Sequence, residues 1–396
     1  MVMMLKVAYL SPLPPQRSGI ADYSARLLPY LAEKVELVVY ANDLEEEGSF
    51  AGCEVRPLLR LHDEWWRYDR RLYHMGNSLH HDAIYMYAMR YSGTIMLHDY
   101  GLHHLIADRV RHHEDRRLYL RELVYAYGQD GAERYWRTRG AIPENLFDNP
   151  LNRRLLESSL GVLTHSDYVR HQVQSHVADL PVSVVPFLDM TDSSQSVVPF
   201  SKASFNVSAD TVVLASAGQI TQNKQIDMIL RLLVQLRREN LYVHYLIIGE
   251  PMVDLGLEEQ IVELGLEGVV TQIGFVDDYH DFLRWIKTAD IILNLRYPTI
   301  GETSAVVFQA LALGRPTVVF NHGWYSEIDR DACVHVPVMD EESLLEEVRE
   351  LVRNLAKRRE IGRAARQLIV DQHQPDVVAE AYRYFLTEQS RRAWAG

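Results

Sequence analysis

The stretch RYPTIGETSAVVFQALALGRPTVVF, residues 296–320, is patterned as a strand end, a short polar turn, an apolar helix, a glycine stop and a second strand. The turn residues Gly301, Glu302, Thr303 and Ser304 bring a carboxylate and two hydroxyls to the start of the helix. Backbone amides at a helix start lack partners within the helix, and the helix dipole favours negative charge there. The stretch therefore predicts one strand–helix–strand unit with polar groups gathered at one point.

The predicted helix offers a face for a ligand with hydroxyls and phosphates. Thr303 or Ser304 can cap the helix or donate to a phosphate oxygen. Glu302 and Gln309 are seven residues apart, so we expect them to share one helical face. The alternative is a capped core helix, stopped at Gly314, in which Glu302 is merely favourable at the N-terminus.

In both halves of the chain, β-rich runs alternate with helical patterns in the same way. The runs are largely apolar, as parallel strands covered by helices on both faces are. Such alternation predicts an α/β chain with two doubly wound, Rossmann-like domains. The expected strands lie in residues 5–12, 35–41, 83–87, 93–99, 161–166, 182–187, 211–218, 242–250, 269–276, 289–296, 316–321 and 332–338.

A chain of 396 residues is too long for one ordinary core, so two domains are expected. The serine-rich stretch 188–210 has weak periodicity, which predicts a boundary near residue 200. We expect domains at 1–200 and 201–375 and a helical tail at 376–396 that packs back on the first domain. Open parallel sheets bind ligands outside the carboxyl ends of their strands, so two facing domains would form a cleft lined by residues that follow strands.

The composition excludes several classes of protein. The net charge of −13 argues against a nucleic-acid binder that relies on overall positive charge. Cys53 and Cys333 lie far apart and suggest neither a disulfide scaffold nor a zinc site. The apolar start is interrupted by Pro12 too early for a signal peptide, and no apolar run reaches the length of a spanning helix. We therefore expect a soluble, cytoplasmic protein.

Two further loops follow predicted first strands. In AGQITQNKQID (217–227), Gly218 permits close backbone approach and Lys224 can meet an anion as a point charge, although a lysine at a helix start is usually solvated. In SPLPPQRSGIADYSARLLPYL (11–31), three prolines stiffen the loop before Ser18 and Gly19. We expect this loop to close over a phosphate or sugar; the alternative is a plain strand–helix connection.

These stretches resemble glycosyltransferase family 4 (group 1), retaining enzymes of the two-domain GT-B fold that use nucleotide sugars. The resemblance lies in GQITQNKQIDMILRLL, in the stretch from GFVDDYH to GRPTVV, in SPLPPQRSGIADYSA, and in the short GNSLHH and IMLHD. It covers most of the chain and is more specific in the second half. It implies that the second domain holds the donor nucleotide and the first domain mainly holds the acceptor.

The sequence departs from the family in its pair of glutamates. The family usually has two glutamates eight residues apart, and Gln309 stands where the second is expected. Counting back from the helix places the first at Gly301, whereas counting from Pro298 places it at Glu302, which we favour. Gln309 can still form a hydrogen bond with a ribose, but without charge.

A second departure concerns the cations that hold the donor pyrophosphate. Lys224 is present, but Gln219 stands where the family commonly has an arginine. We expect Arg296 or Arg17 to supply the missing positive charge.

The resemblance also suggests residues for the sugar and the acceptor. His98, at a strand end before Asp99, can accept or donate a proton near neutral pH, unless it is structurally paired with Asp99. Asn77, His80 and His81 are expected to line the acceptor pocket, together with Asp99. The full set is Lys224, Glu302 and His98 for catalysis, Arg17, Gly19, Gly218, Gln219, Arg296, Gly301, Thr303, Ser304 and Gln309 for the donor, and Asn77, His80, His81 and Asp99 for the acceptor.

We therefore expect a hexosyltransferase that retains anomeric configuration and needs no metal or other cofactor. Adjacent histidines on a helix point apart, and the sequence has no H-E-x-x-H framework. The alternatives are a nucleotide-sugar 2-epimerase and a non-catalytic sugar-nucleotide-binding protein. The stretches 65–75 and 116–128 mix aromatic residues with arginine, so they either rest on an anionic membrane that carries a lipid-linked acceptor or form helices with core aromatics and solvated arginines.

Overall fold

The computed structural model describes residues 4–42, 44, 46–143, 146–191 and 196–393. Contacts divide the chain into two compact units. Unit 1 consists of Met1–Leu188, Ile300–Thr303 and Gln374–Gly396, and unit 2 of Asp189–Thr299 and Ser304–His373. The first unit thus ends at Leu188, whereas the serine-rich stretch predicts a boundary near residue 200. Residues 192–195 of that stretch lie outside the described residues.

The sheet of unit 1 has eight strands. They are β1 (Lys6–Leu10), β2 (Glu36–Ala41), β3 (Gly48–Phe50), β4 (Cys53–Pro57), β5 (Arg70–Met75), β6 (Thr94–Leu97), β7 (Gly161–Thr164) and β8 (Val182–Val184). Their order is β3-β4-β2-β1-β5-β6-β7-β8, and all neighbours pair in parallel except β3 with β4. β1 and β6 are almost wholly buried, as parallel strands beneath helices must be.

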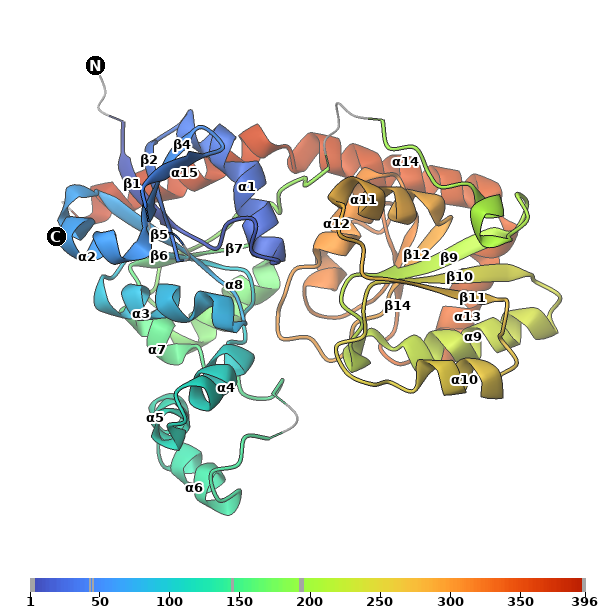
Figure 1. Cartoon of the computed structure of the whole chain (residues 1–396), viewed down its shortest axis with the longest axis horizontal. Helices are drawn as coiled ribbons and strands as arrows, with labels where there is room; N and C mark the ends of the chain where they lie inside the picture. The colour runs from blue at the N-terminus through green and yellow to red at the C-terminus, as the bar shows by residue number, and fades with distance from the viewer. Residues whose placement is uncertain (1–3, 43, 45, 144–145, 192–195, 394–396) are drawn as a thin grey trace. The chain divides into compact units, whose positions relative to one another are not determined.

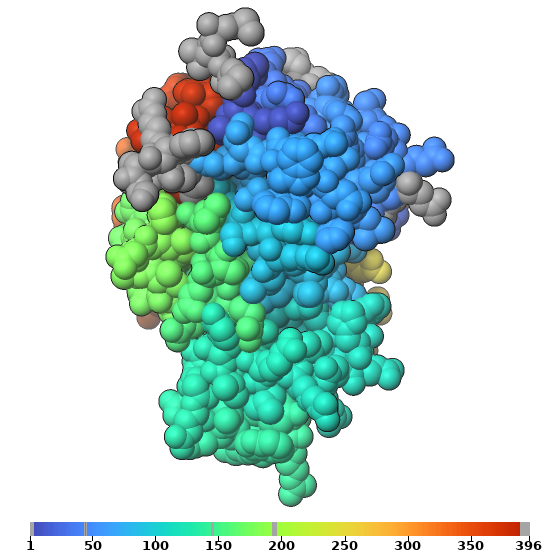
Figure 2. Space-filling model, turned by 90° about the vertical axis from the view of Figure 1, so that its left-hand side faces the viewer, coloured from blue at the N-terminus to red at the C-terminus, as the bar shows by residue number. Residues whose placement is uncertain are grey.

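Helices cover both faces of this sheet (Figure 1). The helices of this unit are α1 (Gly19–Ala32), α2 (Leu61–Glu64), α3 (Asp82–Arg90), α4 (His103–His112), α5 (Arg116–Tyr127), α6 (Gln129–Arg137), α7 (Arg153–Ser158), α8 (Asp167–His176) and α15 (Pro375–Ala393). The chain from α4 to α6 forms a projection at the lower end of the unit (Figure 2).

Helix α15 lies against α1, so segments from opposite ends of the sequence complete unit 1. The hydroxyl oxygens of Tyr382 and Tyr23 are 3.1 Å apart, and the Tyr382 ring stacks on His74 with ring centroids 6.0 Å apart. An ion pair of 2.7 Å joins Lys34 to Asp376. The described α15 is thus part of the core of the unit.

One expectation for unit 1 is wrong. Residues 83–87, expected to be a strand, belong to helix α3, because a short apolar run fits a buried helix as well as a buried strand. Burial of Ile84, Tyr85 and Ala88 shows that one helical face meets the core. The stretch 65–75, for which helices with core aromatics are one of the two alternatives, contains strand β5.

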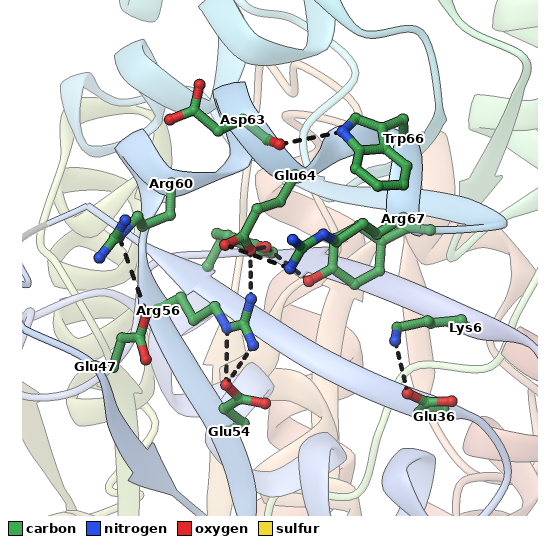
Figure 3. Close-up of polar contacts among 12 residues, drawn as sticks. Lys6, Glu36, Glu47, Glu54, Arg56, Arg60, Asp63, Glu64, Trp66 and Arg67 are labelled. Carbon is green, nitrogen blue, oxygen red and sulfur yellow. Dashed lines mark hydrogen bonds and ion pairs between the residues drawn. The ribbon is translucent and has the colours of Figure 1, made fainter.

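A polar network precedes β5 (Figure 3). Glu64, at the end of α2, pairs with Arg56 of β4 and accepts a hydrogen bond of 2.7 Å from the Tyr40 hydroxyl. Arg56 also pairs with Glu54 at 2.7 Å. These contacts hold α2 against the sheet before the chain enters β5.

The sheet of unit 2 has six strands, all parallel. They are β9 (Val212–Ala217), β10 (Val243–Ile248), β11 (Val270–Gly274), β12 (Ile291–Asn294), β13 (Thr317–Phe320) and β14 (Val334–Val336). Each lies in a run where the sequence predicts a strand. Their order is β11-β10-β9-β12-β13-β14. This is a doubly wound sheet: successive strands are added toward one edge from β9 to β11 and toward the other edge from β12 to β14, so the strand order reverses between β9 and β12.

Helices also cover both faces of the second sheet (Figure 1). They are α9 (Ile226–Arg238), α10 (Leu257–Glu263), α11 (Tyr279–Thr288), α12 (Ala305–Ala312), α13 (Glu341–Arg353) and α14 (Leu355–Gln372). One apolar core lies beneath α9, α10 and α13, and another beneath α11 and α12. Within the described part of the chain, no helix combines the length and apolarity needed to span a bilayer.

Candidate functional site

The loops after β9 and β12 lie where the strand order of unit 2 reverses. In doubly wound sheets, ligands bind at this point, outside the carboxyl ends of the strands. Gly218 directly follows β9, and Arg296 comes two residues after β12. The structure therefore places two of the predicted donor residues at the edge where a ligand is expected.

Gly218 is a point of close contact between three segments. Its φ of +84° is in the left-handed region that favours glycine. A Cβ atom at this position would lie 3.1 Å from Lys224 Nζ and 3.2 Å from Val306 Cγ2. The loop after β9, the turn Gln222–Lys224 and the first turn of α12 thus meet here.

Lys224 is buried, with only 4% of its surface exposed, so the alternative of a solvated lysine is wrong. Its Nζ donates a hydrogen bond to Ala217 O. Burial lowers the pKa of Lys224 well below its usual value, and the positive charge of Arg296 lowers it further. Because a buried cation beside a second cation is costly, an anion at this point would stabilise both.

The start of α12 adds positive potential at the same place. Ser304 is the N-cap residue, and its Oγ accepts a hydrogen bond of 3.4 Å from Val307 N. The amides of Ala305 and Val306 have no acceptor within the helix. Anions bind readily at such a helix start. Lys224, Arg296 and α12 together can therefore hold a phosphate group.

The expectation that Glu302 and Gln309 share a helical face is wrong. Helix α12 begins only at Ala305, and Gly301 has a φ of +81°, so Glu302 lies in an irregular turn before the helix. Its carboxylate accepts a hydrogen bond of 2.8 Å from Ile300 N. By contacts, Glu302 belongs to unit 1 and Gln309 to unit 2.

Within unit 1, residues 300–303 pack against the loop that follows β6. Gly101 N donates a hydrogen bond of 2.9 Å to Ile300 O. A Cβ atom on Gly301 would lie only 2.6 Å from Tyr100 Cβ, so no other residue fits this position without a shift. Thr303, in the same segment, is half-buried.

A polar cluster in unit 1 brings the predicted acceptor residues Asn77 and Asp99 together with His104. Asn77 N donates to Asp99 Oδ2 at 2.8 Å, and Asn77 Nδ2 lies 2.8 Å from His104 Nδ1. Burial lowers the pKa of His104, while the negative charges of Asp108 and Glu302 oppose this shift. His104 thus contacts Asn77 and lies close enough to Glu302 for the carboxylate to act on its pKa, which its place in a histidine doublet does not reveal.

His98 lies in a buried group of aromatic side chains. Its Nε2 is 2.9 Å from His74 Nδ1, and its ring centroid is 5.0 Å from that of Tyr23. Burial lowers the pKa of His98 well below its usual value, and the neighbouring His74 and His165 lower it further. His98 is therefore neutral at neutral pH and can accept or donate a hydrogen bond.

The remaining predicted residues of unit 1 differ in exposure. His80 is exposed, and its Nδ1 lies 2.8 Å from Gln16 Nε2. His81 is fully buried against Gly76, so it does not reach the surface. Arg17 and Gly19 are exposed in the loop after β1 and at the start of α1. In unit 2, Gln219 is also exposed.

Gln309 is buried in α12 and contacts Tyr279 of α11. Gln309 Nε2 lies 3.0 Å from the Tyr279 hydroxyl, which lies 3.2 Å from Met190 O. A phenol has one proton, so a hydroxyl that donates to the carbonyl of Met190 must accept from the Gln309 amide. This orientation leaves Gln309 Oε1 buried and without a hydrogen-bond partner among the described residues.

In the described ranges, no three His, Cys, Asp or Glu residues are grouped so that they could hold a metal ion. The expectation that the reaction needs no metal stays a prediction.

Residues 198–368 match the family model described as glycosyl transferases group 1. No curated protein sequence matches the chain. The chain is similar to the solved structure of Anabaena HepE in complex with UDP, with a TM-score of 0.64 and 15% identity over 97% of this chain and 100% of that one. Sucrose-phosphate synthase from Thermosynechococcus elongatus has a TM-score of 0.67 and 15% identity over 98% and 99%.

A third similar structure is WaaG, a glycosyltransferase involved in lipopolysaccharide biosynthesis. Its TM-score is 0.61, with 15% identity over 96% of this chain and 99% of that one. At such identities the likeness concerns the fold. Residues 198–368 therefore match glycosyl transferases group 1, within a chain that has the GT-B fold.

Proposed function

We propose that the protein is a retaining glycosyltransferase of family 4 that moves a hexose-type sugar from a nucleoside-diphosphate sugar to a hydroxyl acceptor. The observation that carries the proposal is the buried Lys224 beside Arg296, within the group 1 domain. Structures of HepE contain UDP and UDP-glucose, which supports a nucleotide-sugar donor here. We place the reaction in the cytoplasm, in the biosynthesis of a polysaccharide or glycoconjugate, with an acceptor that is a glycan, a lipid-linked sugar or a small molecule.

The proposed reaction releases a nucleoside diphosphate, on which negative charge develops as the bond to the sugar breaks. The Lys224 ammonium and the free amides of α12 would stabilise that charge, each by about 2–4 kcal/mol. Attack on the same face of the sugar, assisted by the leaving phosphate, retains the configuration and needs no protein nucleophile. Glu302 and neutral His98 are our candidates for contacts with hydroxyls of the sugar or acceptor.

The test is incubation with a panel of nucleotide sugars and acceptors, followed by NMR of the products. Release of nucleoside diphosphate with a sugar of unchanged anomeric configuration would support the proposal, and inversion would contradict it. We expect Lys224→Met to lower turnover about 10²–10³-fold, whereas Lys357→Met, on the surface of α14, should not. Alanine at Arg296 or Arg17 should weaken donor binding.

The same incubation separates the alternatives. Formation of an epimer without an acceptor would indicate an isomerase. Binding without turnover would indicate a non-catalytic protein. This outcome is tested because the neutral Gln219 and Gln309 stand where the family has charged residues.

A further inference from the structure

Unit 2 has a pocket of about 470 Å³ at the end of the sheet opposite the candidate donor site. Lys287, which lines it, precedes β12, and Gly314 precedes β13, so the pocket lies near the amino ends of the strands. Gly218 and Arg296, in contrast, follow their strands. The volume is within the range of roughly 300–1,000 Å³ that small-molecule sites have.

The pocket is strongly basic. Lys287, Arg359, Arg363 and Arg366 line it, and none of the described lining residues is acidic. The whole chain has 54 acidic and 41 basic side chains, so this pocket reverses the general charge of the protein. Such a concentration of positive charge attracts anions.

The three arginines have no partner within the described residues. No hydrogen bond or ion pair joins Arg359, Arg363 or Arg366 to another described side chain or carbonyl. Their neighbours in α14 are partnered: Lys357 pairs with Glu347 at 3.4 Å, and Arg358 donates to backbone carbonyls. The described side chains of Arg359, Arg363 and Arg366 thus differ from those of Lys357 and Arg358 in facing the pocket without a partner.

Lys287 is held close to these arginines without a compensating acid. Its Nζ donates a hydrogen bond of 2.5 Å to Leu313 O. Burial lowers the pKa of Lys287 to about 8, and the charges of Arg315 and Arg366 contribute. A lysine that loses hydration beside other cations is stabilised when an anion binds among them.

Two glycines bring α14 over Lys287. A Cβ atom on Gly362 would lie 2.3 Å from Gly314 O, so the helix backbone touches the loop after α12 directly. This contact brings the backbone of α14 against the loop at Gly314, so the arginines of α14 and Lys287 line one pocket.

We propose that this pocket binds a multiply charged, phosphate-bearing anion, held by Lys287, Arg359, Arg363 and Arg366. Guanidinium groups match pairs of phosphate oxygens, and the lysine adds a point charge. The phosphates could belong to a free phosphorylated compound or to a phospholipid head group, and the recognition chemistry is the same. The proposal does not depend on the proposed transferase activity.

The test uses pyrophosphate, titrated calorimetrically into the full chain carrying Lys224→Met, so that binding at the candidate donor site is weakened. Arg363→Gln/Arg366→Gln in that background should weaken binding roughly tenfold for each arginine removed, and binding should weaken as salt rises. The matched control, Arg238→Gln/Arg330→Gln, removes the same charge from exposed positions of the same unit and should bind normally.

Two further measurements complete the test. Hydrogen exchange on the unsubstituted chain should show protection of residues 355–372 by pyrophosphate, which does not depend on how Lys224→Met folds. Pelleting with phosphatidylglycerol vesicles identifies the source: vesicle binding that the arginine variant loses indicates a lipid head group, and pyrophosphate binding alone indicates a free compound. If neither pyrophosphate nor vesicles distinguish the arginine variant from its control, the proposal is overturned.

Discussion

Lys224 is the residue on which the proposed chemistry depends most. It is buried and lies close enough to Arg296 for the two positive charges to repel. A lysine in this setting gives up its proton more easily than one in water. Binding of a diphosphate reverses the balance, because the new negative charges favour the ammonium form.

We therefore expect nucleoside-diphosphate binding to be accompanied by proton uptake at Lys224. The lowered pKa of Lys224 in the free protein rises when the diphosphate binds, so protons are taken up at any pH between the two values. Titration calorimetry in two buffers of different ionisation enthalpy measures the number of protons. The uptake should vanish in Lys224→Met and persist in Lys357→Met; binding without uptake at every pH from neutral to alkaline would contradict the prediction.

The contact between Tyr279 and Gln309 leads to a second prediction. Tyr279→Phe removes the acceptor of the Gln309 amide, so Oε1 is no longer held in one orientation. We expect donor affinity to fall by about the value of one hydrogen bond, 0.5–1.5 kcal/mol. Tyr384→Phe, on an exposed ring, is the control. Equal donor affinity in the two variants would show that Tyr279 does not position the amide.

Site residues were predictable where a strand end marks them. Gly218 and Arg296 follow apolar runs, and parallel strands present such positions at one edge. Tyr279, His74 and His104 have no local signal, because their partners lie 30, 24 and 27 residues away. Such contacts depend on how helices and strands pack, which a single sequence does not specify.

At the scale of elements, the sequence predicts strands best where runs are long and flanked by helical patterns. All strands of unit 2 are of this kind. In unit 1, the run at 83–87 is too short to distinguish helix from strand. Strand β5 begins with two arginines, so it does not show the continuous apolar run by which a buried strand is predicted, although its remaining residues are buried. Ser304 caps α12 as one of the two residues expected there, whereas Glu302 lies in the polar turn before the helix and not on its face.

Because α14 packs closely against the loop after α12, we expect a single methyl group added at Gly362 to lower the free energy of unfolding markedly. Gly362→Ala would place a Cβ atom 2.3 Å from Gly314 O, and backbone cannot move away as a side chain can. We expect a loss of about 1–3 kcal/mol in the free energy of unfolding, as for other overpacked sites. Urea unfolding of the full chain measures it.

Gly19→Ala is the matched control for this substitution. Gly19 begins α1, and a Cβ atom there would meet nothing within 4 Å. The change should leave the free energy of unfolding equal or raise it by up to about 1 kcal/mol. A similar loss in both glycine variants would mean that backbone contact does not explain the effect at Gly362.

Across the whole molecule, buried neutral histidines make unit 1 sensitive to acid. Burial lowers the pKa of His81 to about 3 and that of His103 to about 4. The unfolded chain binds protons at these residues below about pH 6.5, whereas the folded chain does not. The contribution of these histidines to stability should therefore be constant above that pH and fall as the pH drops from 6.5 toward the folded values.

His81 alone should lower the free energy of unfolding by about 2 kcal/mol between pH 7.5 and pH 5, because each pH unit below 6.5 removes about 1.4 kcal/mol. Urea unfolding at the two pH values measures this loss. His81→Leu should reduce the difference by that amount, and His280→Leu, at an exposed position, should not. An unchanged pH dependence in His81→Leu would contradict the prediction.

The docking of α15 on α1 has a consequence for the nascent chain. Tyr382 covers Tyr23 and His74, yet the ribosome makes α15 only after every residue of unit 2. We expect unit 2 to fold during translation, when the core of unit 1 around Tyr23 and His74 is still exposed because α15 has not been synthesised. We therefore expect the half that is synthesised first to mature last and to be the half that binds a chaperone.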